Sequence, residues 1–373
     1  MSEFYIVGAG FFGATVAERL ANFGISVTII EKRAHIGGNS YSEIDKDSGI
    51  EYHKYGSHIF HTSNERVWEY VNRFTKFNQY RHTVWTTFKN KAYTMPISLS
   101  TINAYYDLNL KPHEVAGFLS KERAKESYDN PKNLEEKAIS LVGRPLYEAF
   151  IRGYTIKQWE KDPKELSADI ITRLPVRHNY VNRYFKDKYE GIPLDGYGSV
   201  FKNILNHPKI AVRLNSDYFC LRDEIGDAPT LYTGPIDRFF DFKHGNLDWR
   251  TIDFKKEIYD VEDFQGCSVM NYADETIKHT RIHEFKHFHP ERNSVNHTLT
   301  FKEYSRVAGK VDEPYYPVNT PRNSNLLRLY QQDIKKAKNV IFGGRLGSYR
   351  YFDMEATIAH ALELSDKIIA RHK

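Results

Sequence analysis

The chain opens on Phe4-Tyr5-Ile6-Val7-Gly8-Ala9-Gly10-Phe11-Phe12-Gly13, in which a short apolar run leads directly into the pattern Gly-x-Gly-x-x-Gly. Residues 14–21 then carry apolar side chains with the period of an amphipathic helix, and a second apolar run, residues 25–30, ends on Glu31. This order predicts a strand, a helix and a second strand, the first unit of a doubly wound, Rossmann-like parallel sheet of the α/β class.

Each glycine of this stretch has a distinct use in binding a dinucleotide. Gly8 allows the tight turn, Gly10 lets a pyrophosphate approach the backbone, and Gly13 lets helix and strand pack closely. The helix N-terminus offers N–H groups to the phosphates, and Glu31 can accept a hydrogen bond from a ribose 2′-OH, which favours NAD or FAD over NADP. A glycine-rich turn without a ligand is the alternative, but strand, helix, second strand and acid all occupy the expected places.

Composition excludes several classes of protein. The 373 residues carry a net charge of +5 with Lys and Arg dispersed, which argues against a nucleic-acid-binding arm. Two cysteines, Cys220 and Cys267, cannot form a disulfide framework, so we expect a reducing, cytoplasmic location. No apolar run is long enough to span a membrane, and because a core strand is predicted almost at once we expect no signal peptide.

The hydrophobic pattern changes twice along the chain, which predicts three domains. Helical patterns dominate after Pro96, and alternating runs typical of antiparallel strands follow from about residue 247 to 304. We expect a dinucleotide domain from residues 1–80, 206–242 and 335–373. A helical domain would span 96–180, and an antiparallel sheet domain would comprise 81–95, 181–205 and 243–334, with the substrate in the cleft between them.

Several polar or aromatic groups could serve either a site or the core. His58 and His61 follow Gly56 in a compact stretch that suits a flavin-facing loop or a buried turn. Phe150, Tyr154 and Gln158 share a helical face that suits a binding wall or a core stripe.

Two further groups carry charge chemistry. Arg173 and Arg177, beside a loop rich in aromatic residues, could clamp a diphosphate, or they could be solvated surface arginines. His283, His287 and His289 would share one face of a strand, but no carboxylates or cysteines are arranged around them, so we predict no metal site.

Together these motifs resemble the bacterial UDP-galactopyranose mutase family over essentially the whole chain. The resemblance rests on the first glycine turn and on seven further motifs: residues 31–39, 55–62, 153–159, 173–177, 232–237, 313–318 and 342–346. It implies an isomerase that interconverts UDP-galactopyranose and UDP-galactofuranose for surface polysaccharide. FAD, active when reduced, would form a covalent adduct between its N5 and the sugar, without net redox change. The resemblance also implies a homodimer.

The resemblance implies roles for individual residues. Cofactor contacts would come from Gly8, Gly10, Phe12, Gly13, Glu31, Lys32, Gly38, Asn39, His58, Ile59, Asp217, Tyr218, Gly344, Arg345, Asp353 and Met354. Substrate contacts would come from His82, Phe150, Tyr154, Thr155, Trp159, Arg173, Tyr184, Phe185, Asn271, Arg281, Tyr315 and Tyr351. Catalysis would depend on Arg173, which closes on the diphosphate from a mobile loop, and on Arg281, His61, Tyr351 and Asp353.

Other interpretations remain open. Which of Arg173 and Arg177 is the clamp depends on spacing from Trp159, and Glu160 stands where the family often has glycine. UDP-N-acetylgalactosamine is a possible second substrate. A flavin amine-oxidase-like oxidoreductase shares the cofactor frame but needs no nucleotide clamp, and a non-catalytic dinucleotide sensor would tolerate loss of the arginines.

Overall fold

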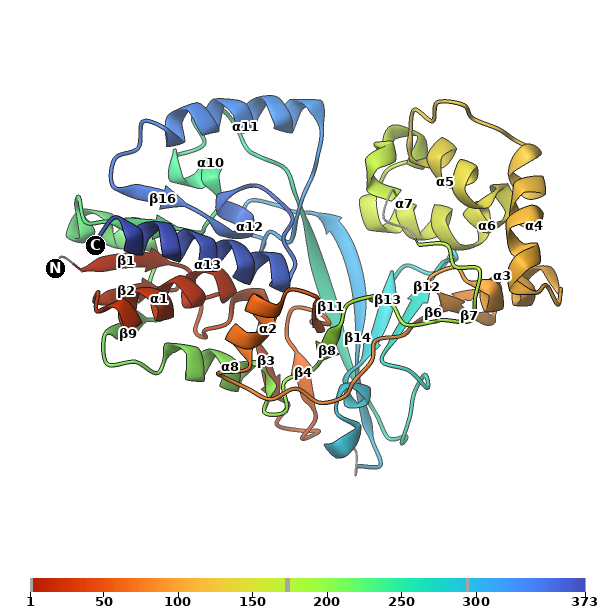
Figure 1. Cartoon of the computed structure of the whole chain (residues 1–373), viewed down its shortest axis with the longest axis horizontal. Helices are drawn as coiled ribbons and strands as arrows, with labels where there is room; N and C mark the ends of the chain where they lie inside the picture. Colours follow the sequence, from red (N-terminus) through yellow and green to blue (C-terminus); the bar gives the residue numbers. More distant parts are fainter. Residues whose placement is uncertain (1–2, 172–174, 293–294, 373) are drawn as a thin grey trace.

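The computed structural model describes residues 3–171, 175–292 and 295–372. A parallel sheet with its helices forms one end of the molecule, a group of helices forms the other, and an antiparallel sheet lies between them (Figure 1). Arg173 therefore lies outside the described residues.

The parallel sheet has five strands in the order β16-β10-β1-β2-β9. They span β1 (Phe4–Val7), β2 (Val27–Ile30), β9 (Ile210–Arg213), β10 (Thr230–Tyr232) and β16 (Val340–Phe342). Strand alternation sends Phe4 and Ile6 into one apolar cluster and Tyr5 and Val7 into another on the opposite face. The sheet is thus covered on both faces, as in a doubly wound fold.

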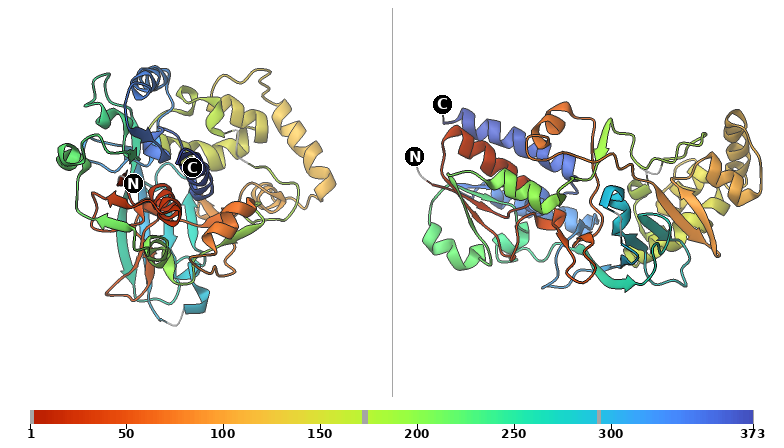
Figure 2. Two further views of the ribbon diagram at one scale, coloured as in Figure 1. Left: turned by 60° about the vertical axis from the view of Figure 1, so that its left-hand side comes forward. Right: turned by 90° about the horizontal axis from the view of Figure 1, so that it is seen from below.

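Helices fill both clusters. One face carries α1 (Phe11–Phe23), α8 (Gly196–Leu205) and α13 (Met354–Ala370), and α13 runs alongside α1 (Figure 2). The other face carries α9 (Tyr218–Ile225) and α10 (Ile236–Phe239). Helix α1 stops at Gly24, whose left-handed φ of 105° suits a residue without a Cβ.

The antiparallel sheet has seven strands in the order β15-β11-β14-β13-β12-β6-β7. They span β6 (Val84–Phe88), β7 (Lys91–Met95), β11 (Trp249–Tyr259), β12 (Val269–Tyr272), β13 (Arg281–Glu284), β14 (Thr298–Val307) and β15 (Tyr316–Pro317). One pairing, β12 with β6, is parallel. Strands β11 and β14 form a long ribbon that extends away from the parallel sheet (Figure 1).

The helical group packs around a separate core that includes Leu119, Ile139, Leu146 and Tyr147. Its helices are α3 (Leu99–Tyr106), α4 (Pro112–Ala124), α5 (Leu134–Val142), α6 (Arg144–Tyr147) and α7 (Gly153–Trp159). Between α6 and α7 lies a π-helical turn, η2 (Glu148–Arg152), within the stretch where the sequence analysis places Phe150 and Tyr154 on one helical face. Such turns often occur at functional sites.

Smaller elements complete the chain. They are α2 (Glu65–Val71), α11 (Pro321–Ile334) and α12 (Gly344–Gly347), with the two-stranded pairs β3 (Ser42–Ile44) with β4 (Glu51–His53) and β5 (Phe60–Thr62) with β8 (Tyr189–Gly191). Short single-turn helices lie at Gly38–Ser40, Pro163–Glu165, Ala168–Ile171, Phe285–Phe288 and Pro290–Arg292. Within the described ranges, no helix is both long and apolar enough to cross a bilayer.

One segment lies elsewhere than the sequence suggests. The sequence analysis places residues 181–205 in the antiparallel sheet domain, but within that range Tyr197, Phe201 and Ile204 of α8 pack in the same core as α1. An amphipathic helix shows which face is buried but not which partner covers that face, so its placement needed the tertiary structure.

Candidate functional site

A cavity of about 1540 Å³ extends from the glycine turn of the parallel sheet to the helical group. Every site residue that the sequence analysis assigns to cofactor, substrate or catalysis lines this cavity, with Arg173 alone outside the described residues. The segments that contribute come from both ends of the sequence, from Gly8 to Met354. The structure therefore shows that these residues lie around one cavity, whereas the role of each residue stays a prediction.

The dinucleotide end of the cavity is formed by two glycine turns. Gly8 has a φ of 104°, and a Cβ on Gly13 would lie 2.0 Å from the Gly8 carbonyl oxygen. The second turn folds onto the first, because Gly37 N donates to Ala9 O at 2.9 Å and a Cβ on Gly38 would lie 3.1 Å from Gly10 Cα. Within the described residues no side chain caps Gly10, so the first N–H groups of α1 face the cavity.

Glu31 is the acid that the sequence analysis places at the ribose. Its buried carboxylate lines the cavity and accepts hydrogen bonds from Ala9 N at 2.8 Å and Arg33 N at 2.9 Å. These contacts fix the carboxylate beside the glycine turn. Free backbone donors, a cradle that any Cβ would fill and an oriented acid fit an adenine dinucleotide.

Lys32 and Arg33 are tied to the loop that precedes β15. Both contact Glu313, Lys32 Nζ at 3.0 Å and an Arg33 terminal nitrogen at 2.7 Å, and Arg33 also stacks on Tyr55. Glu313 therefore pairs with the two cations that could otherwise bind the 2′-phosphate of NADP.

Arg345 lies in the middle of the cavity with an uncompensated charge. Its guanidinium donates to the carbonyl oxygens of Phe352, at 2.5 and 3.1 Å, and of Tyr315, at 3.2 Å. No carboxylate of the described residues forms an ion pair with it. A guanidinium whose hydrogen bonds within the described residues go to carbonyl oxygens, with no carboxylate beside it, is well suited to attract an anionic ligand.

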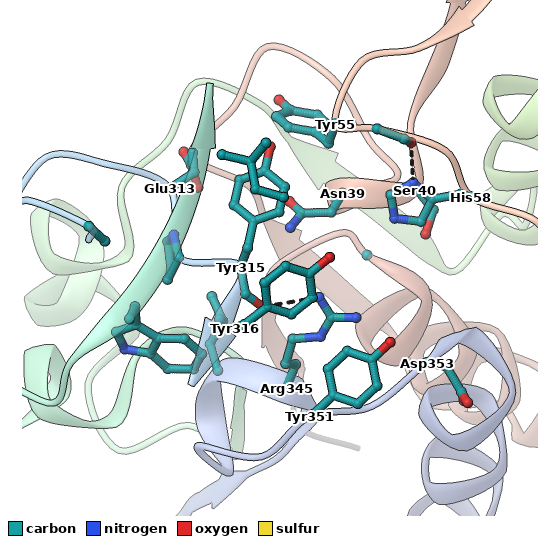
Figure 3. A pocket seen from close by; sticks show the side chains of 18 of the residues that line it. Asn39, Ser40, Tyr55, His58, Glu313, Tyr315, Tyr316, Arg345, Tyr351 and Asp353 are labelled. Carbon is teal, nitrogen blue, oxygen red and sulfur yellow. Dashed lines mark hydrogen bonds between the residues drawn. The ribbon is translucent and has the colours of Figure 1, made fainter. Parts of the chain in front are cut away.

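Two consecutive tyrosines point to different parts of the cavity, and the sequence analysis selected only the first. Tyr315 lies toward Tyr55 and Asn39, whereas Tyr316 lies over Arg345 beside Tyr351, with ring centroids 5.9 Å apart (Figure 3). Burial raises the pKa of both phenols, so both stay protonated donors. Tyr316 is thus a candidate that the sequence analysis missed. Tyr316 opens β15 directly after Tyr315, and the opposite facing of consecutive residues in extended backbone was the signal that could have revealed it.

Half-buried Arg281 and buried Glu303 form an ion pair across β13 and β14. Arg281 Nε lies 3.1 Å from a Glu303 carboxylate oxygen, and a terminal nitrogen of Arg281 donates to the Tyr154 hydroxyl. Burial alone would raise the pKa of Glu303, but Arg281 and His283 outweigh burial and hold this pKa at about 2. Glu303 therefore fixes the guanidinium in place before any ligand binds.

His283 extends this pair toward the predicted flavin loop. Its Nε2 lies 2.9 Å from Glu303 and its Nδ1 lies 2.5 Å from the Ser57 hydroxyl. Burial lowers the pKa of His283, so a neutral ring donates to Glu303 and accepts from Ser57. Strand β13 ends at Glu284, so His287 and His289 leave its face and contact Asp263 and Glu291 instead. The three histidines do not converge on one another. The expectation that no carboxylates surround them is wrong, however, because Asp263 and Glu284 lie around His287, with one potential ligand atom of each residue within 4.8 Å of the others.

Helix α7 forms the opposite wall. Tyr154 and Trp159 line the cavity, and burial raises the pKa of Tyr154 to about 12. Glu160 ends the helix with a left-handed φ of 52°, the conformation that glycine adopts most readily. Its carboxylate pairs at 2.9 Å with Arg250, which is 2% exposed and also donates to the Trp159 carbonyl oxygen.

Arg177, the alternative candidate for the clamp, holds a loop together. Its guanidinium is buried and donates to the carbonyl oxygens of Val181, Arg183 and Tyr184, which fold the aromatic loop around it. Arg177 does not line the cavity. The clamp assignment to Arg173 consequently stays a prediction.

Three histidines lie between the two ends. Burial lowers the pKa of His58 to about 4 and of His82 to about 3, so both rings are neutral. His61 stacks on Phe185 with ring centroids 3.6 Å apart, and its Nδ1 lies 2.8 Å from Asp187.

Two amide oxygens in the cavity wall have no hydrogen-bond donor among the described residues. They are Asn271 Oδ1 on β12 and Gln158 Oε1 on α7, and both oxygen atoms are buried. Unsatisfied buried acceptors are costly, so a ligand with donor groups fits this end of the cavity. Asn271 was predicted as a substrate contact, and Gln158 was only placed on the helical face.

Comparisons with known proteins agree with this geometry. The family model described as UDP-galactopyranose mutase matches residues 149–351, and the model of an NAD(P)-binding Rossmann-like domain matches residues 6–74. A probable UDP-galactopyranose mutase of Klebsiella pneumoniae is 43% identical over 366 residues, covering 98% of this chain and 94% of that protein. A dTDP-fucopyranose mutase of Escherichia coli is 40% identical over 380 residues, the full length of both.

The fold is also similar to a solved one. The crystal structure of reduced UDP-galactopyranose mutase aligns with a TM-score of 0.77, covering 99% of this chain and 94% of that one, at 15% identity. At that identity the likeness concerns the fold alone.

Proposed function

The chain belongs to the UDP-galactopyranose mutase family, and we propose that it interconverts UDP-galactopyranose and UDP-galactofuranose with FAD as its cofactor. The observation that carries this proposal is the single cavity in which a dinucleotide cradle continues into a wall of arginines and tyrosines. A flavin oxidase would need the cradle but not the second wall.

The protein's part in this reaction is to bind, orient and stabilise charge. Reduced FAD supplies a nucleophilic N5, so the chain itself needs no nucleophile. Arg281 and Arg345, with the hydroxyls of Tyr316 and Tyr351, would bind the diphosphate and stabilise the charge that UDP gains as it leaves the sugar. Phe150 and Tyr154 would flank the uracil.

Arg173, Trp159 and His61 would act nearer to the sugar. We propose that Arg173 closes on the diphosphate, that Trp159 bounds the sugar, and that His61 lies beside the sugar and the flavin. The Arg173→Ala variant should lose turnover while it retains FAD. Normal turnover in this variant would instead assign the clamp elsewhere.

A second substrate is supported by a specific observation. The dTDP-fucopyranose mutase aligns along the full length of both chains at nearly the same identity as the galactose enzyme. Thymidine diphosphate fucose differs from UDP-galactose in three groups. It has an extra methyl group on the base, and it lacks the ribose 2′-hydroxyl and the C6 hydroxyl of the sugar. Since a pocket built to bind a hydroxyl strongly rejects the analogue without it, the ratio of kcat/KM for the two furanoses separates the candidates.

The first experiment is a visible spectrum followed by turnover assays. We expect a yellow protein that converts UDP-galactofuranose to the pyranose only after reduction with dithionite. Conversion of dTDP-fucofuranose alone would reassign the substrate, and activity of the oxidised protein on an amine would support an oxidase. A colourless protein that cannot be reconstituted with FAD would overturn the cofactor.

Two broader expectations belong to the same proposal. We propose that the protein is a homodimer. We also propose that it works in the cytoplasm, where its two unpaired cysteines, one exposed and one buried, would stay reduced. Light scattering of the purified protein tests the homodimer, and fractionation of the producing cells tests the cytoplasmic location.

A further inference from the structure

His61 is held in one orientation before any ligand is present. It lies on β5, its ring packs flat on Phe185 with an interplanar angle of 14°, and its side chain is 18% exposed at the cavity wall. Its Nδ1 is 2.8 Å from Asp187 Oδ2. Because Nδ1 is occupied, Nε2 is the ring nitrogen left for a ligand.

Asp187 is itself fixed by contacts on the same side. Its other oxygen, Oδ1, accepts from the Ser63 hydroxyl at 2.9 Å, and Lys188 N donates to the same hydroxyl at 3.1 Å. Two residues later β8 begins and pairs with β5, placing Glu190 opposite His61. The carboxylate is therefore anchored to the strand that carries the histidine.

The pair also joins two parts of the site. Asp187 follows Tyr184 and Phe185, which line the substrate end, whereas His61 lies two residues beyond Ile59 at the predicted flavin contact. A carboxylate on one imidazole nitrogen sets which nitrogen carries the proton and restricts rotation of the ring.

We propose that Asp187 is a positioning residue that holds the proton of His61 on Nδ1 and so presents Nε2 to the reacting sugar. This inference rests on the proposed mutase function. It concerns a residue on a loop outside every motif from which the family was identified.

The test is nitrogen NMR of the oxidised, FAD-loaded protein labelled at its 16 histidines, with His61→Gln used to assign the His61 signals. In the wild type we expect a protonated Nδ1 and an unprotonated Nε2. In Asp187→Asn the amide donates to Nδ1, so the proton moves to Nε2. Since loss of the carboxylate that orients a catalytic histidine leaves the wrong tautomer, kcat should fall about tenfold or more with KM nearly unchanged.

Two controls separate positioning from a general loss of structure. Asp187→Glu keeps a carboxylate and should retain the wild-type tautomer. Ser63→Ala removes the other bond to Asp187 and should retain both tautomer and kcat. An unchanged tautomer in Asp187→Asn overturns the proposal, as does a Ser63→Ala protein that behaves like Asp187→Asn. The tautomer needs no turnover, so an inactive wild type would refute the proposed function without deciding this result.

Discussion

At its dinucleotide end the cavity is walled mainly by backbone, and at its substrate end mainly by side chains. The first end uses Gly10, Gly38 and the N-terminus of α1, which lie within thirty residues of sequence. The second uses Arg281, Tyr154 and Tyr316, which come from three separate elements, and Arg281 donates to the Tyr154 hydroxyl.

This difference determines what a substitution can do. A side chain added to a backbone cradle excludes the ligand outright, because the approaching phosphate has no space. A side chain removed from the other end leaves its neighbours in place but loses part of the binding or transition-state stabilisation. The following predictions test that contrast, beginning with the largest expected effect.

Gly10→Val should abolish FAD retention while the protein still folds. A Cβ at Gly10 meets only Gly38 Cα, at 3.7 Å, so the added methyl groups would occupy the phosphate site rather than the core. The ratio of flavin to protein absorbance measures the loss. Gly13→Ala is the matched comparison, since its Cβ would strike the Gly8 carbonyl and should destabilise the fold by about 3 kcal/mol or more. A Gly10→Val protein that stays yellow would contradict the backbone interpretation.

Arg281→Lys should reduce kcat about 100-fold and leave the melting temperature nearly unchanged. Lysine preserves the charge next to Glu303 but cannot reproduce the guanidinium geometry toward Tyr154 and the diphosphate. Turnover of UDP-galactofuranose by the reduced enzyme is the measurement. Arg306→Lys, which changes a half-buried arginine that pairs with Asp253 and Asp312 and does not line the cavity, is the control and should be fully active.

Tyr316→Phe should weaken UDP binding about tenfold, whereas Tyr315→Phe should change it less than threefold. A hydrogen bond to a charged phosphate contributes about 1.5–3 kcal/mol, and only the Tyr316 ring lies beside both Arg345 and Tyr351. Calorimetric titration with UDP measures both constants. The reverse order of effects would return the role to Tyr315.

Substitutions of Glu160 should have the smallest effect, and they should change only the free energy of unfolding. Glu160→Ala loses the pair with buried Arg250 and keeps the left-handed φ of 52°, so it should unfold more easily than Glu160→Gly by about 1 kcal/mol. Urea denaturation of both variants measures the difference. Equal stabilities would show that backbone strain at this position is negligible.

The sequence predicted the dinucleotide end well because its information is local. The glycine spacing, the helix that follows and Glu31 all lie in one short unit, and the structure folds them as a cradle. The segments forming the parallel sheet could be recognised too, since each strand is apolar and bounded by turn residues.

The substrate end shows where such reasoning stops. Tyr315 was chosen over Tyr316 because a motif gives position but not the face of a strand. Arg177 and Arg281 look alike in sequence, yet one donates to loop carbonyls and the other pairs with Glu303. Glu303 and Asp187 were not singled out, since a carboxylate that orients another residue has no spacing pattern of its own.

The order of strands in the parallel sheet has a consequence for biosynthesis. Strand β1 is made first, but its neighbour β10 begins at Thr230, and β16 beyond it begins at Val340. At about 5–20 residues per second, a ribosome needs roughly 20–70 s between β1 and β16. Throughout that interval the first glycine turn is translated but lacks its sheet. We therefore expect the nascent chain to acquire its flavin only near the end of translation, with chaperones shielding β1 until then.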